Sequence, residues 1–171
     1  MMAALRALAI TMTVTLAVVL HVTVFGYFSY DGVVPNLALL VVVAAALVRG
    51  PEFAAVLGFV AGLAVDLAPP ADHVAGRWAL ALVVVGYIVG RVRHDAGTSA
   101  VAAVVAVAAS SFIGTSVFAL SGMLLGDPVV PGVEALQVIP VAVLYDVLLT
   151  PFVLPPAMVL FRRFERHQVA Y

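Results

Sequence analysis

Three ionisable side chains lie inside long apolar stretches of this chain: His21, Asp66 and Asp146. An unpaired charge at the centre of a membrane-spanning helix costs at least about 2.5 kcal/mol, so each group must be neutral, paired or turned towards a polar cavity. Counted along helices from the nearest charges at one membrane face, the three residues lie about 14 to 16 positions from that face, or roughly 21 to 24 Å. This shared depth predicts one intramembrane polar cluster.

Such a cluster has two interpretations. It either lines a small outward cavity that binds a proton or a ligand, or it is a set of buried hydrogen bonds that fixes the register of the helices. We favour the second, because polar contacts between transmembrane helices are ordinary packing devices. For Asp66 a third interpretation stays open, namely that it ends its helix in the headgroup region, where its cost is small.

Small residues recur every four positions before Asp66, at Ala54, Gly58 and Gly62, and so share one face of a helix. Such a face allows another backbone to approach closely, and this packing drives helix association in lipid. The face therefore packs either against a neighbouring helix of the same chain, which we favour, or against a second copy in a homodimer. Gly86 and Gly90 repeat the spacing.

Known catalytic constellations are absent from the sequence. The chain has no Cys, which excludes thiol nucleophiles and disulfides. It contains no HExxH, no P-loop and no Gly-x-Ser-x-Gly. We expect His73 and His94, each beside an aspartate, to be solvated loop residues. The sequence thus predicts no enzyme, no metal site and no cofactor, and the net charge of −1 gives no reason to expect nucleic acid.

Composition identifies the elements that must position these residues. Hydrophobic residues make up 65% of the 171 residues and the mean hydropathy is +1.22, far above soluble domains. We predict an all-α polytopic membrane protein with a single transmembrane domain over residues 1–171. Six transmembrane helices are expected at about 7–28, 35–48, 53–67, 77–90, 100–125 and 138–161. The second and third are short, which predicts that they pack as a shielded pair.

Arginines set the predicted orientation. Seven of the eight basic residues fall in alternate gaps between the apolar runs, so that one topology places all seven on the same side. By the positive-inside rule that side is the cytoplasm, which holds both termini. The seven are Arg6, Arg49, Arg91, Arg93, Arg162, Arg163 and Arg166.

The last predicted span contains three prolines after Asp146, at Pro151, Pro155 and Pro156. Proline lacks a backbone N–H and disrupts the preceding helical turn, so we expect a kink here. The longest outer loop is expected just before this span, over residues 126–137.

Four segments together resemble one known family: Pro35–Leu40, Ala46–Gly50, Gly58–Leu67 and Val85–Gly90. In their order and spacing the chain is similar to the rod shape-determining protein MreD family. The resemblance implies a scaffold subunit of the bacterial plasma membrane, in the elongation complex that builds lateral peptidoglycan and maintains cell shape. Implied partners are an MreC-type bitopic protein, a glycan polymerase and transpeptidase pair, and MreB. Asn is common in the family at the position of Asp146.

The family's fold resembles the substrate-binding subunits (S components) of energy-coupling-factor transporters, and this kinship gives the alternative function. In that alternative the chain is the small-molecule, vitamin-like substrate-binding subunit of a membrane transporter. The predicted outer loops offer few polar groups, with one Trp and no Lys in the whole chain. A binding pocket normally needs several convergent polar groups, so the scaffold is the preferred interpretation.

Overall fold

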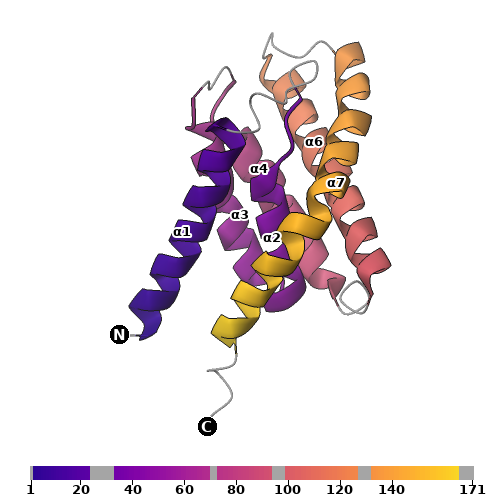
Figure 1. Cartoon of the computed structure of the whole chain (residues 1–171). Helices are drawn as coiled ribbons and strands as arrows, with labels where there is room; N and C mark the ends of the chain where they lie inside the picture. Colours follow the sequence, from indigo (N-terminus) through magenta and orange to yellow (C-terminus); the bar gives the residue numbers. More distant parts are fainter. Residues whose placement is uncertain (1, 24–32, 70–72, 94–98, 127–131, 166–171) are drawn as a thin grey trace.

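The computed structural model describes the chain except residues 1, 24–32, 70–72, 94–98, 127–131 and 166–171. The described part is a bundle of α-helices (Figure 1), in agreement with the predicted fold class. The helices are α1 (Met2–Thr23), α2 (Leu37–Arg49), α3 (Pro51–Asp66), α4 (Arg77–Arg91), α6 (Ala100–Leu125) and α7 (Gly132–Glu165). By length and composition, Ala100–Leu125 and Val138–Arg163 are each apolar enough to cross a membrane.

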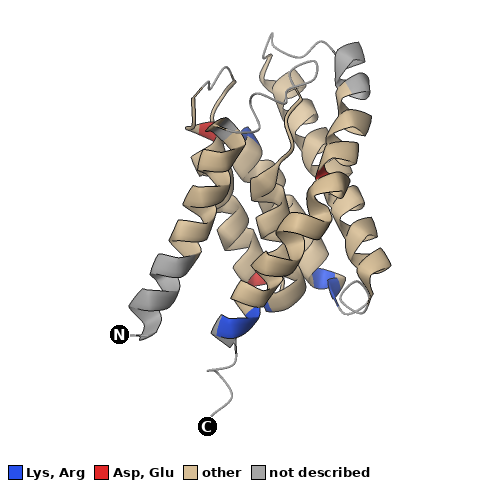
Figure 2. Ribbon diagram, viewed as in Figure 1, with Lys and Arg blue, Asp and Glu red and all other residues tan. Residues whose placement is uncertain are grey.

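The helices run alternately up and down, so α1 begins and α7 ends at the same end of the bundle (Figure 1). We call this the arginine end, because Arg49, Arg91, Arg162 and Arg163 lie in the last turns of their helices there (Figure 2). Arg93 lies at the same end, where it contacts the Val48 carbonyl. Arg77 begins α4 at the opposite end.

Helix bounds differ from the predicted spans mainly in the first and last helices. α1 already begins at Met2, whereas residues 24–28 of the predicted span lie outside the described part. α7 begins at Gly132 and runs to Glu165, so part of the predicted outer loop over residues 126–137 is helical. Val, Glu, Ala, Leu and Gln follow Gly132, and several of them are strong helix formers. Glu134, one of the residues that suggested a loop, therefore belongs to the first turns of a helix, whereas residues 127–131 lie outside the described part.

α2 is the axis of the bundle. Every residue from Leu37 to Val48 is buried, and the helix contacts α1, α3, α4, α6 and α7. A helix that is apolar on all sides is expected at such a position. The 12 residues Leu37–Val48 thus lie at the centre of the hydrophobic core, enclosed by the other helices.

α3 and α4 pack against each other through reciprocal glycine contacts. A Cβ added at Gly58 would strike the Leu82 carbonyl, and one at Gly62 would strike the backbone of Ala79. From the other side, a Cβ at Gly86 would lie 2.5 Å from the Ala54 carbonyl oxygen. The small-residue face of α3 is thus covered by α4 within the same chain.

Candidate functional site

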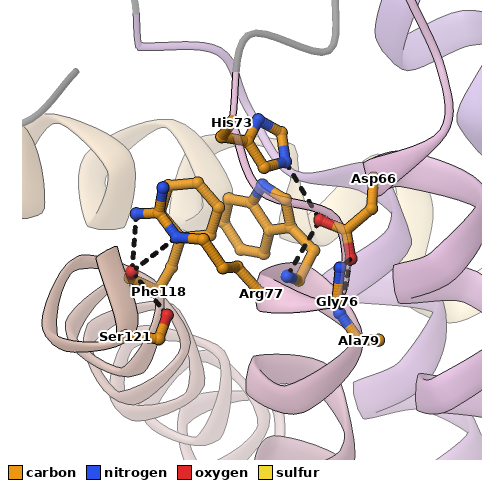
Figure 3. Close-up of polar contacts among 8 residues, drawn as sticks. Asp66, His73, Gly76, Arg77, Ala79, Phe118 and Ser121 are labelled. Atoms are coloured by element: carbon orange, nitrogen blue, oxygen red, sulfur yellow. Dashed lines mark hydrogen bonds and ion pairs between the residues drawn. The ribbon is translucent and has the colours of Figure 1, made fainter. Parts of the chain in front are cut away.

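The buried acid of α3 caps the next helix. Asp66 is 1% exposed, and its carboxylate accepts hydrogen bonds from the backbone N–H groups of Gly76, Trp78 and Ala79 at 2.8, 3.1 and 3.1 Å (Figure 3). These groups open α4, whose own N-cap residue, Gly76, has no side chain to offer and a φ of 100°. Asp66 therefore supplies from α3 the cap that α4 lacks, and its negative charge faces the positive end of the helix dipole.

His73 completes this cap. Its Nε2 donates to Asp66 Oδ1 at 3.0 Å, and the His73 side chain is only 16% exposed. The ring also meets Phe118 of α6 edge to face, with centroids 5.1 Å apart. The prediction that His73 is a solvated loop residue is wrong: the turn after α3 folds the ring back onto the carboxylate. His94 lies outside the described residues.

Arg77 joins this cluster to α6. Its guanidinium lies 3.8 Å from the Phe118 ring centroid, and its Nη2 donates to the Phe118 carbonyl at 2.8 Å (Figure 3). Gly122, one turn further along α6, leaves room for this group, since a Cβ there would strike Arg77 Nη2. Trp78 stacks on the same Phe118 ring at 4.5 Å. The cluster thus ties the α3–α4 turn to α6.

The second buried acid, Asp146 in the middle of α7, contacts the start of α2. Asp146 is 2% exposed; its Oδ1 accepts from the backbone N–H of Asn36, and its Oδ2 from the Ser111 hydroxyl, both at 2.7 Å. Asn36 in turn caps α2, its side-chain oxygen accepting from the Leu39 N–H at 3.0 Å. Asp146 therefore fastens α7 to both α6 and the N-terminus of α2.

His21 is fixed to the same turn from the other side. Its Nδ1 donates to the carbonyl of Pro35 at 2.8 Å, so His21 and Asp146 bind adjacent residues of the chain. Asp66 has a separate set of partners, between His73 and Ala79. No hydrogen bond between described residues joins the three predicted cluster members directly, and each one anchors the start of a helix.

The arrangement has little capacity for chemistry. Both oxygens of Asp66 and both oxygens of Asp146 accept hydrogen bonds from the protein's own donors. No group of three or more His, Cys, Asp or Glu side chains in the described part is placed to hold a metal ion. The only buried side-chain N or O atom without a partner, within the described residues, is Asn36 Nδ2. Both acids thus serve as buried caps.

Sequence reasoning missed the partners of these acids. Asn36 had a recognisable signal, since it stands three positions before Leu39 at the start of an apolar run, as an N-cap does. Gly76 immediately precedes the predicted fourth span, and a glycine there leaves helix N–H groups that need an outside acceptor. Ser111 carried no signal, because its partner is 35 residues away.

Comparison with known sequences gives one family. The model of the family described as rod shape-determining protein MreD matches residues 1–163. No curated protein and no solved structure matches the chain significantly.

Proposed function

The chain belongs to the rod shape-determining protein MreD family, a membrane family that acts in cell shape rather than in catalysis, and from this premise we propose that it is a scaffold. In this proposal it holds a single-span membrane protein of the MreC type beside the peptidoglycan polymerase and transpeptidase of the elongation complex. The MreB cytoskeleton is a further partner in the same proposal.

This proposal rests on the hydrogen bonding of the two buried acids, both of which already have donors within the bundle. A transport subunit needs polar groups that are free to bind its substrate, because a pocket gains specificity from a few convergent donors and acceptors. Here the carboxylates of Asp66 and Asp146 are already bound by backbone and side-chain donors of the bundle. Groups that hold helices in place favour a rigid body whose outer faces bind other proteins.

We place the partner helix in a groove between α1 and α3. Its lining includes Thr11 and Thr15 of α1 and Val56, Val60 and Ala64 of α3, and its volume is about 390 Å³. Both threonines are exposed on a largely apolar helix. Hydroxyl and small side chains on a lipid-facing surface are the features through which transmembrane helices associate.

Filling this groove should separate the partners. We expect Val60→Trp to reduce co-purification of the MreC-type protein from detergent by about tenfold, equivalent to about 1.4 kcal/mol, because the indole occupies the space of the partner helix. The matched control is Val105→Trp on α6, where Val105 is 61% exposed and outside the groove. Equal recovery with both variants would place the partner elsewhere.

The transporter alternative predicts a different result. Mass spectrometry of small molecules extracted from the purified chain should find a stoichiometric, vitamin-like ligand that is not a lipid if the chain is an uptake subunit, and Asp146→Ala should remove it. Recovery of such a ligand would overturn the scaffold proposal.

The topology proposed for the scaffold places the arginine end in the cytoplasm, together with both termini, and predicts six spans. Since the chain has no native Cys, single cysteines report their own side of the membrane. In intact cells, Glu52→Cys and Ser99→Cys should resist a membrane-impermeant thiol reagent, whereas Val74→Cys and Leu125→Cys should react with it. These positions are all exposed in the bundle. Labelling of Ser99→Cys from outside would contradict this topology.

A further inference from the structure

A second groove opens between α6 and the latter half of α7, at the arginine end. Its volume is about 670 Å³, and its lining includes Leu47 of the buried helix α2. Ala100 and Ala103 of α6 form one wall, and Val147 and Met158 of α7 belong to the other. This groove is distinct from the one assigned to the partner helix.

The prolines of α7 explain why this groove exists. Near the middle of the bundle α6 and α7 are held together by the Ser111–Asp146 hydrogen bond of 2.7 Å. Beyond it, Pro151 and Pro155 interrupt the hydrogen bonding of α7, which bends a helix. The latter half of α7 then diverges from α6 (Figure 1), and the groove is the space between them. The groove therefore follows from the positions of the prolines in α7.

The inside of the groove offers almost nothing polar. Its two hydroxyl groups are both engaged: Thr150 donates to the Asp146 carbonyl at 2.8 Å, and the Ser99 oxygen accepts from the Ala102 N–H at 3.0 Å. The other lining side chains are hydrocarbon or thioether. An occupant with polar groups along its length would leave them unpaired. The occupant is therefore apolar within the groove.

The mouth of the groove is positively charged. Arg162 is exposed and stands four residues after Met158, on the same face of α7. Arg93 lies at the same end, where its Nη1 donates at 3.1 Å to the carbonyl of Val48, the residue that follows Leu47. The one acidic side chain described at this end, Glu52, is on α3. The charge at the mouth fits a negatively charged head.

The lining of the groove favours a lipid over a partner helix. It lacks the pair of exposed threonines that marks the α1–α3 groove, and its own hydroxyl groups are engaged within the bundle. A transmembrane helix would find few polar contacts there, whereas acyl chains need none.

The geometry points to an anionic phospholipid in this groove, with its acyl chains between α6 and α7 and its phosphate beside Arg162 and Arg93. The lipid comes from the leaflet at the arginine end, which is the cytoplasmic leaflet in the topology proposed above. Anionic lipids are attracted to arginines at this surface. The lipid would seal the opening over Leu47 and so keep α2 fully enclosed.

Native mass spectrometry of the purified full chain tests this assignment. After removal of bound lipid, we expect titration with phosphatidylglycerol to restore one tightly held molecule, and phosphatidylcholine to bind about tenfold more weakly, because it carries no net charge. Ala103→Phe should abolish the tight binding, whereas Ala109→Phe, at an exposed alanine outside the groove, should not. Equal affinity for the two lipids, or equal loss in the two variants, would overturn the proposal.

A second pair of variants removes one positive charge at a time without adding bulk between the helices. Arg162→Gln should weaken phosphatidylglycerol binding by about fivefold, while Arg163→Gln, on another face of α7, should change it by less than about twofold. In native membranes, a photo-reactive residue in place of Leu148, which lines the groove and is 57% exposed, should yield an adduct with the mass of one lipid. An adduct of protein size would show that a helix occupies the groove.

The lipid assignment and the scaffold proposal fail separately. Val60→Trp should leave phosphatidylglycerol binding unchanged, because it alters only the α1–α3 groove. Loss of lipid binding with intact partner binding in Ala103→Phe would show that the lipid and the partner bind at separate sites. Loss of both in that variant, with lipid binding intact in Val60→Trp, would assign the α6–α7 groove to the protein partner instead.

Discussion

Gly62→Leu is expected to destabilise the bundle by about 3 kcal/mol, at the upper end of what overpacking costs. The new side chain starts at a Cβ that lies 2.5 Å from the backbone nitrogen of Ala79, and a backbone atom in a packed helix cannot turn aside as a flexible side chain can. α3 and α4 must therefore separate along their length. The measurement is the thermal unfolding midpoint of the purified protein in detergent.

The control for this prediction lies two residues earlier on the same helix. Val60 is 52% exposed, so Val60→Leu should leave the unfolding midpoint within the error of the measurement. Gly58→Leu should behave like Gly62→Leu, because its Cβ would meet the Leu82 carbonyl. Equal midpoints for Gly62→Leu and Val60→Leu would mean that α3 and α4 do not pack at this distance.

Asp66→Ala is expected to cost at least about 3 kcal/mol, because it removes the acceptor of several buried donors at once. Each buried donor left without a partner costs about 1 to 3 kcal/mol. The Gly76, Trp78 and Ala79 N–H groups all lose their acceptor in this variant. We expect the start of α4 to unravel, with the rest of the bundle weakened.

Trp78 makes this unravelling visible. It is the single tryptophan of the chain and stacks on Phe118 beside the capped turn, so its fluorescence should shift towards that of solvated indole in Asp66→Ala. Glu52→Ala, at an exposed acid on the same helix, should leave both the fluorescence and the stability unchanged to within about 0.5 kcal/mol. An unshifted spectrum and an unchanged midpoint in Asp66→Ala would disprove the capping role.

The sequence alone was sufficient for the helical class, the family and the order of the helices. Long apolar runs, punctuated by arginine, proline and glycine, are a local signal, and the predicted span over residues 100–125 coincides with α6. The bounds of α7 were harder, because residues 132–137 combine polar character with helix-forming side chains. Whether such residues are helical depends on whether the helix that follows extends back through them.

The polar contacts were predicted only in part. A common membrane depth for His21, Asp66 and Asp146 was inferred by counting residues, but such a count leaves the rotation of each helix unknown. Their actual partners, Pro35, Gly76 and Asn36 among them, depend on which helices are neighbours. A pairing such as Asp146 with Asn36, 110 residues apart, is a property of the assembled bundle.

The enclosure of α2 has a consequence for how the protein is made. α2 is among the first helices to leave the ribosome, yet two of the helices that cover it, α6 and α7, are translated last. Until they arrive, α2 is a short apolar segment in contact with lipid, its insertion machinery or a chaperone. A nascent chain that stalls before α7 would expose α2 and leave Asn36 without Asp146. Membrane proteases that recognise loosely packed helices should therefore clear such fragments far faster than the finished protein.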